Sequence, residues 1–115
     1  MKFIVDGMLG KLMRWLRLSG HDTLYVDDLD ARGDEDRSLL EVARSQGRIL
    51  LTSDSELYRR AKKRNVKCAL LKGENVVEQL LDVSRFLGKK IEIDFENSRC
   101  PACNGELMEV GQSEV

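Results

Sequence analysis

Residues 2–20, KFIVDGMLGKLMRWLRLSG, contain the unit from which the fold can be predicted. Lys2–Val5 is rich in β-branched and aromatic residues, which is typical of a short buried strand, and an Asp-Gly pair ends it. Seven apolar residues between positions 8 and 18 follow the period of a helix. Gly20 can end this helix because glycine adopts the left-handed conformation without strain. The stretch therefore predicts a strand followed directly by a helix.

The same alternation repeats three more times along the chain. Further strands are predicted at 23–26, 49–51 and 67–71, and further helices at 37–46, 53–64 and 74–87. At the start of the third helix, Ser53 and Glu56 have the spacing of a capping box. Strands and helices that alternate through short connections favour right-handed βαβ crossovers. We therefore expect an α/β domain with a parallel central sheet of about four strands flanked by helices.

Apolar side chains on the first and last helices are expected to face the core of this domain. On the first helix we include Trp15 in the core, because it belongs to the apolar pattern. The last helix is expected to bury five apolar residues: Val76, Val77, Leu80, Leu81 and Val83.

Length and composition limit the class of protein. The chain has 115 residues, which is typical of one domain, and its 42% of hydrophobic residues argues against a disordered acidic tail. The sequence shows no membrane-spanning run, and its N-terminus shows no apolar run followed by a cleavage site. We therefore expect a cytoplasmic protein.

The formal net charge of −1 conceals an uneven distribution. Residues 1–90 contain 18 basic and 14 acidic residues, whereas residues 91–115 contain one basic and six acidic residues. We therefore divide the chain into a basic body, residues 1–90, and an acidic tail, residues 91–115. A basic body is compatible with a nucleic-acid partner.

Acidic residues follow each of the first three predicted strands. Asp6 follows the first strand, Asp27 and Asp28 follow the second, and Asp54 comes shortly after the third. Asp36 stands near the start of the second helix. The carboxyl ends of parallel strands share one edge, so these carboxylates are expected to converge there. Clustered carboxylates favour Mg²⁺ or Mn²⁺, and two such ions can hydrolyse a phosphodiester.

Each acid taken alone also has a structural explanation. Asp54 would be favourable in the first turn of a helix, and Asp36 could be a helix N-cap. Asp27 and Asp28 could be ordinary loop residues. The metal-site hypothesis depends on the joint pattern.

Several blocks of the sequence resemble a known family, the PIN-like nuclease domain found at the C-terminus of Mut-seven-type exonucleases. The resemblance keeps the order of the blocks and covers nearly the whole chain. The blocks are Val5–Leu12, Arg14–Arg17, Gly20–Thr23, Asp36–Ala43, Gly47–Asp54 and Arg99–Leu107.

This resemblance implies a three-layer PIN-like fold and a ribonuclease that uses divalent metal. It carries Asp6, Asp36 and Asp54 into the catalytic and metal-binding role, with Asp28 and Glu56 as further candidate acids. In the usual pattern of the family, the residue before the third aspartate is often basic. Ser53 occupies this position here, which removes one phosphate contact but leaves metal binding intact.

Two groups of basic residues are candidates for contact with the RNA backbone. One lies on the first helix and contains Lys11, Arg14 and Arg17. The other extends from Arg59 to Lys67 without an acid, and from it we select Arg59, Arg60 and Lys63. The alternative for the second group is a solvated helix face.

The cysteines indicate half of a zinc ribbon. Cys100 and Cys103 form one Cys-x-x-Cys, but structural zinc needs four ligands, so the set is incomplete. The family usually has a second pair, and the chain looks truncated in this region. The alternatives are an orphan knuckle, which we favour, a zinc ion shared by two chains of a homodimer, or reduced thiols. Cys68 lies in an apolar strand and is expected to be buried, whereas His21 is expected to be a surface turn residue.

We therefore expect a metal-dependent ribonuclease that hydrolyses RNA at an acidic Mg²⁺ or Mn²⁺ site. One alternative is a non-catalytic RNA-binding module in RNA processing or ribosome assembly. Another is a toxin-type PIN nuclease with an antitoxin-like protein partner. A phospho-acceptor signalling domain fits less well, because the first strand ends in a single aspartate.

Overall fold

The chain alternates between strands and helices, as its apolar pattern predicts. The structure is a computed structural model, and it describes residues 2–25 and 35–88. In chain order the elements are β1 (Lys2–Val5), the 3₁₀ helix η1 (Gly7–Leu9), α1 (Gly10–Leu18), β2 (Asp22–Tyr25), α2 (Glu35–Gln46), β3 (Ile49–Thr52), α3 (Ser55–Lys63), β4 (Cys68–Leu70) and α4 (Val76–Leu87).

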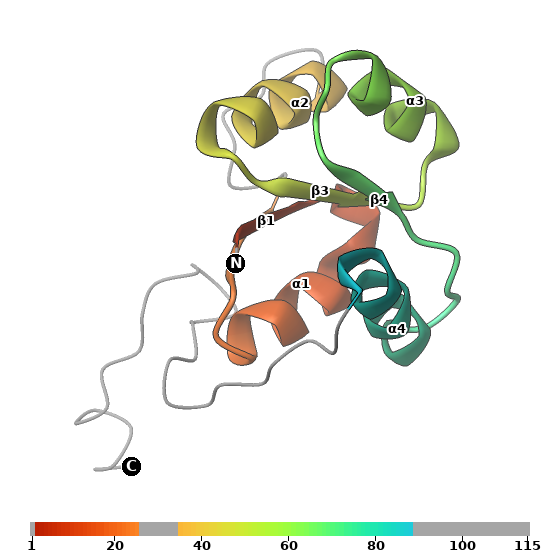
Figure 1. The fold of residues 1–115 in the computed structure, drawn as a ribbon. Coiled ribbons are helices and arrows are strands. Elements are labelled where there is room, and N and C mark those ends of the chain that lie inside the picture. The colour runs from red at the N-terminus through yellow and green to blue at the C-terminus, as the bar shows by residue number, and fades with distance from the viewer. Residues whose placement is uncertain (1, 26–34, 89–115) are drawn as a thin grey trace, which may run out of the picture.

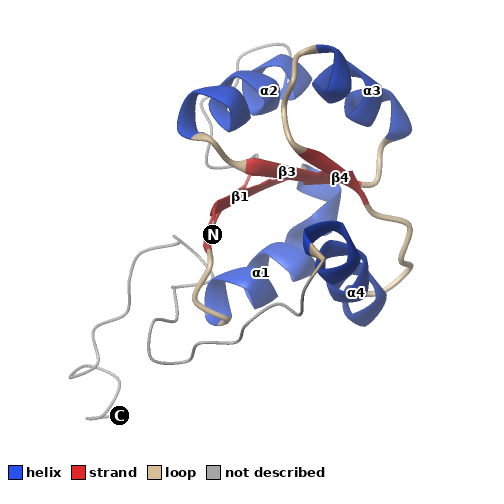
Figure 2. Cartoon of the chain, in the orientation of Figure 1, coloured by secondary structure: helices blue, strands red, loops and turns tan. Residues whose placement is uncertain are grey.

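The four strands form one sheet in the order β2-β1-β3-β4, and every pair is parallel. Helices α2 and α3 cover one face of the sheet, and α1 and α4 cover the other (Figure 1). The sheet therefore forms the middle of three layers, with helices on both sides (Figure 2). This arrangement confirms the predicted α/β class and agrees with a three-layer PIN-like domain.

Each face of the sheet buries its own apolar cluster. Along β1, Phe3 and Val5 belong to the cluster that contains α1 residues and Val83 of α4. Ile4, between them, belongs to the cluster that contains residues of α2 and α3. Successive side chains of a strand point to opposite faces, so one short strand supplies both cores.

Two helix starts differ from the prediction. The Ser53–Glu56 capping box is wrong: α3 begins at Ser55, and Asp54 is its N-cap. The N-cap alternative for Asp36 is also wrong, because α2 already begins at Glu35 and Asp36 lies inside it. In both cases the helix starts next to an acid that we selected as a candidate metal ligand.

The buried face of α1 differs from the prediction at Trp15 and Arg17. Trp15 is 49% exposed, so its expected place in the core is wrong, whereas the Arg17 side chain is 1% exposed. The buried stripe follows the i, i+3, i+4, i+7, i+8 spacing of one helix face and consists of Leu9, Leu12, Met13, Leu16 and Arg17. Arg17 occupies the last position of that stripe, and Trp15 lies outside it.

The prediction for α4 is wrong at two of its five positions. Val83 is buried, and Val76 and Leu80 pack against the core at its edge. Val77 and Leu81 are 63% and 50% exposed, because each lies one residue beyond the inward-facing positions.

Arg48 closes the edge of the sheet where the strands begin. Its side chain is buried and donates from Nη1 to the Asp22 carboxylate at 2.8 Å and to the Phe3 carbonyl oxygen at 3.1 Å. From Nε it donates to the side-chain oxygen of Gln46 at 2.7 Å. This network connects β1, β2 and the end of α2, and it leaves the opposite edge of the sheet for the acidic residues.

Some predictions concern residues outside the described ranges. These are the acidic tail 91–115 with Cys100 and Cys103, and the acids Asp27 and Asp28. No helix in the described part of the chain is long and apolar enough to cross a membrane.

Candidate active site

Asp6 is held at the carboxyl end of β1 by the neighbouring strand β3. Its backbone N–H donates to the Leu51 carbonyl oxygen at 3.1 Å, which continues the parallel ladder by one residue. Its Oδ2 accepts a hydrogen bond of 2.8 Å from the Thr52 hydroxyl. The other oxygen, Oδ1, accepts a longer bond of 3.4 Å from Met8 N–H and so caps η1. Asp6 thus follows a buried strand and stands at a fixed position on the sheet edge.

Thr52 connects Asp6 with Asp54. The Thr52 side chain is fully buried, and its hydroxyl accepts a hydrogen bond of 3.0 Å from Asp54 N–H while donating to Asp6. The Oδ1 atom of Asp54 accepts from Glu56 N–H at 2.9 Å and caps α3. Its Oδ2 makes no hydrogen bond to any residue in the described ranges. One hydroxyl therefore fixes the position of Asp6, at the end of β1, relative to Asp54, which follows β3.

Asp36 lies in the first turn of α2 and is paired with Arg60 of α3. Their closest atoms, Oδ2 of Asp36 and Nη1 of Arg60, are 3.4 Å apart, and each side chain is about one third exposed. Arg60, a predicted RNA contact, is thus the counter-ion of a predicted metal ligand. Such a partly exposed pair adds little stability by itself, because water screens it.

The three predicted metal ligands have the donor chemistry that a divalent ion needs. Asp6, Asp36 and Asp54 offer only carboxylate oxygens, which is the chemistry that Mg²⁺ and Mn²⁺ prefer. Among residues 2–25 and 35–88, however, no group of three or more His, Cys, Asp or Glu side chains is arranged so as to hold a metal ion. The donor chemistry fits the ion, and the assignment of these three aspartates as ligands stays a prediction.

Of the further candidate acids, Glu56 lies in the first turn of α3 and is exposed. Its backbone N–H, rather than its carboxylate, takes part in the hydrogen bonds around Asp54. Asp28 lies outside the described residues.

The basic residues of α1 do not all reach the surface. Lys11 and Arg14 are exposed, and neither forms an ion pair with another described residue. Arg17 is buried, and its Nε donates to the Thr23 carbonyl oxygen at 2.8 Å. The predicted RNA contact of Arg17 is therefore wrong, because its guanidinium stabilises the packing of α1 against β2.

The basic residues of α3 extend away from the acidic edge. Arg59 and Lys63 are exposed. At 1.5 Å per residue, Lys63 lies about 13 Å along the helix from Asp54, toward the edge where the strands begin. Arg59 is one turn of helix nearer to the acids, so it is the better placed of the two exposed residues for a substrate bound there.

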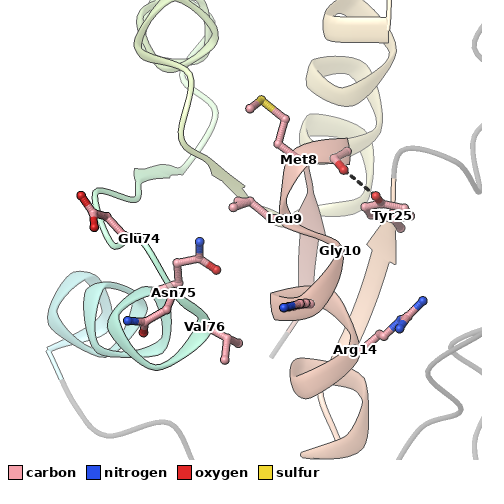
Figure 3. Close-up of a pocket in the computed structure, with 11 residues that line it drawn as sticks. Met8, Leu9, Gly10, Arg14, Tyr25, Glu74, Asn75 and Val76 are labelled. Atoms are coloured by element: carbon pink, nitrogen blue, oxygen red, sulfur yellow. Dashed lines mark hydrogen bonds between the residues drawn. The ribbon is translucent and has the colours of Figure 1, made fainter.

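A cleft of about 580 Å³ opens beside Asp6, between the start of α1 and the start of α4. Figure 3 shows Glu74, Asn75 and Val76 on one side of this cleft, Tyr25 and Arg14 on the other, and Gly10 between them. The Tyr25 hydroxyl donates to the Gly7 carbonyl oxygen, so β2 anchors the turn that follows Asp6. No sequence pattern predicts this cleft, because it depends on how α1 and α4 pack on the same face of the sheet.

The remaining candidates have structural roles. Cys68 is buried as expected, and its burial raises the pKa of the thiol to about 12, although the nearby positive charge of Lys62 opposes this shift. His21 is only partly exposed, and its ring contacts Phe3 edge to face, with 5.7 Å between the ring centroids. The expectation of a simple surface turn residue is therefore corrected: the imidazole packs on the core.

Sequence reasoning missed Thr52 and Arg48. Both are polar residues at the ends of β3, and polar residues that flank an apolar strand carry little signal of their own. The signal for Thr52 is its position, directly after the apolar run Ile49–Leu51 and two residues before Asp54.

Comparison with known proteins gave one match. The family model described as the Mut7-C RNAse domain matches residues 1–115. No match was found among curated proteins, and none was found among solved structures.

Proposed function

The chain belongs to the Mut7-C RNAse domain family, which indicates a ribonuclease-type function, and we propose that it hydrolyses RNA phosphodiester bonds at the edge where Asp6 and Asp54 lie. The observation that carries the proposal is the Thr52 hydroxyl, which donates to the carboxylate of Asp6 and accepts from the backbone of Asp54. A buried hydroxyl that holds two acids in register is the support that a catalytic carboxylate needs.

In the proposed site, Asp6, Asp54 and Asp36 would hold Mg²⁺ or Mn²⁺. A bound ion would neutralise the carboxylates and supply a water molecule of lowered pKa for attack on phosphorus. Hydrolysis then forms one bond from the water oxygen to phosphorus and breaks the bond from phosphorus to the leaving oxygen, which takes up a proton. No covalent intermediate with the protein forms.

Other residues of the chain orient Asp6, balance the charge of Asp36 and contact the RNA backbone in the proposed reaction. Thr52 keeps one oxygen of Asp6 in a fixed orientation, and the other oxygen accepts the longer bond from Met8 N–H. Arg60 compensates the charge of Asp36. Lys11 and Arg14 stand one to two turns after Asp6 and neutralise phosphates of the RNA backbone.

The test is cleavage of single-stranded RNA by the Asp6→Asn variant in the presence of Mg²⁺ or Mn²⁺. Asparagine keeps an acceptor oxygen for Thr52 but loses the negative charge, so the fold is expected to keep its stability. Cleavage is expected to fall at least about 100-fold, beyond the loss that is usual for a supporting residue. Glu41→Gln is the matched control, because Glu41 is an exposed acid on α2 that pairs only weakly with Arg37.

Full activity of Asp6→Asn would contradict the proposal. If the wild-type chain cleaves no RNA with either ion, but binds RNA in a salt-dependent manner that does not need the acids, the chain is the non-catalytic RNA-binding module instead.

A further inference from the structure

The cleft beside Asp6 has the size and position of a substrate subsite. Its volume of about 580 Å³ lies within the range of roughly 300–1,000 Å³ that small-molecule sites occupy. Its lining begins at Gly7, the residue directly after Asp6. A group bound there would therefore lie next to the proposed centre of hydrolysis, not on it.

One wall of the cleft is rigid, because hydrogen bonds hold the turn from β4 to α4. The backbone N–H groups of Lys72 and Gly73 both donate to Oδ2 of Asp82, at 2.9 and 2.8 Å. The next N–H, of Glu74, donates to the side chain of Glu78 at 2.7 Å. Gly73 packs so closely on α4 that an added Cβ would lie 2.6 Å from Cβ of Glu78. The wall is thus formed before any ligand arrives.

Two amides on this wall have fixed orientations. Asn75 uses Oδ1 to accept from Glu78 N–H at 2.9 Å, so its Nδ2 remains a donor. Gln79 uses Nε2 to donate to the Gly73 carbonyl oxygen at 3.4 Å, so its Oε1 remains an acceptor. Neither remaining group makes a hydrogen bond to another residue of the described ranges. Both residues line the cleft.

The middle and the far side of the cleft suit a phosphate. Gly10 has no side chain, so the start of α1 lets a ligand approach the backbone closely. Lys11 and Arg14, one and four residues after Gly10 in α1, also line the cleft and supply two cations. Tyr25 contributes an aromatic wall that is already anchored to Gly7.

We propose that this cleft binds one nucleotide of single-stranded RNA, adjacent to the bond that is cleaved. Its phosphate lies against Lys11 and Arg14, and its base lies on the wall of Asn75 and Gln79. A donor amide and an acceptor amide on one wall complement the neighbouring acceptor and donor atoms that the Watson–Crick edge of every RNA base offers, so this wall accepts any base. The proposal rests on the proposed function only for the position of the cleaved bond.

The test measures binding of the full chain to labelled single-stranded oligomers of uridine, adenosine or cytidine by fluorescence anisotropy. The integrity of each oligomer is checked by gel electrophoresis after the titration. The wild-type chain is expected to bind all three oligomers. Asn75→Ser keeps an N-cap for α4 but removes the amide donor, and is expected to weaken binding of each oligomer roughly three- to tenfold.

Gly10→Ala tests the floor of the cleft. Alanine fits the helical backbone at this position, and its Cβ would be in ordinary contact with the Tyr25 hydroxyl at 3.4 Å, so the fold tolerates it. The added methyl is expected to weaken binding of all three oligomers. Arg44→Ala is the matched control: it removes an exposed cation near the end of α2, away from the cleft, and is expected to bind like the wild type in all three titrations.

Unchanged binding of all three oligomers by Asn75→Ser would overturn the proposed base contact. Unchanged binding by both Gly10→Ala and Asn75→Ser would overturn the subsite as a whole. Failure of catalysis gives a different result: the wild-type chain would then bind the oligomers more tightly than Asn75→Ser does, although no cleavage is seen.

Discussion

Replacing Thr52 by valine is expected to separate the two acids of the proposed centre without changing the shape of the core. Valine has nearly the volume of threonine and the same preference for a strand. What it removes is the hydroxyl that donates to Asp6 at 2.8 Å and accepts from Asp54 N–H at 3.0 Å. Asp6 is then free to turn, and the Asp54 N–H loses its partner at a partly buried position.

The size of the effect follows from these two hydrogen bonds. A bond to a charged group contributes about 1.5–3 kcal/mol and a neutral bond about 1 kcal/mol. Water can replace part of the bond to Asp6, which is not fully buried, so a loss of about 2 kcal/mol in the free energy of unfolding is expected. With an m-value of roughly 2 kcal/mol/M, the urea midpoint falls by about 1 M. Cleavage is expected to fall about 10–100-fold, as for the loss of other residues that orient a ligand.

Two matched variants separate the hydroxyl from the rest of the side chain. Thr52→Ser keeps the hydroxyl and loses one buried methyl group, so it is expected to lose about 1 kcal/mol of stability but to keep its activity. Thr23→Val changes a second fully buried threonine, whose hydroxyl donates to the His21 carbonyl oxygen at the opposite edge of the sheet. It is expected to lose stability without a specific loss of cleavage.

The measurements are urea denaturation followed by circular dichroism and cleavage of RNA at saturating Mg²⁺ or Mn²⁺. If Thr52→Val cleaves RNA as fast as Thr52→Ser, the hydroxyl does not position Asp6. If its urea midpoint equals that of the wild type, the two hydrogen bonds do not stabilise the fold as argued.

Three further outcomes are expected. Arg48→Met removes the buried guanidinium that pairs with Asp22 and should lower the free energy of unfolding by about 3 kcal/mol in urea denaturation; an unchanged midpoint would contradict this. Arg17→Lys should lower the melting temperature but leave the salt dependence of RNA binding unchanged, because Arg17 is buried. Arg14→Ala should reduce the slope of log K against log salt by about one; equal slopes for the two variants would argue against Arg14 as a phosphate contact. Burial raises the pKa of Cys68 from 9.0 to about 12, so the unfolded chain loses the thiol proton first and the free energy of unfolding should fall as the pH rises from about 9 toward 12. In Cys68→Ala this contribution to the pH dependence should be absent. Thermal unfolding of both chains over this pH range measures the difference.

The order of strands and helices could be predicted from the sequence, because apolar periodicity is a local property. Ile49, Leu50 and Leu51 form a continuous apolar run, and only a strand covered on both faces explains such a run beside helical segments. The parallel sheet then implied that Asp6 and Asp54 end up at the same edge, which the shared hydrogen bonds of Thr52 confirm. The stripe of α1 was also present in the sequence, since the spacing from Leu9 already includes Arg17 and omits Trp15.

Other features depended on the tertiary structure. Arg17 tolerates burial only because β2 brings the Thr23 carbonyl oxygen to its Nε, and no local pattern foretells that partner. The same holds for Arg60, whose counter-ion comes from another helix, and for the cleft between α1 and α4. The sequence by itself thus determined which segments are strands or helices and which acids share an edge. Only the packed fold decided which charged groups are paired, because a hydrogen bond needs atoms within about 3 Å of each other, and this chain brings them there from distant positions.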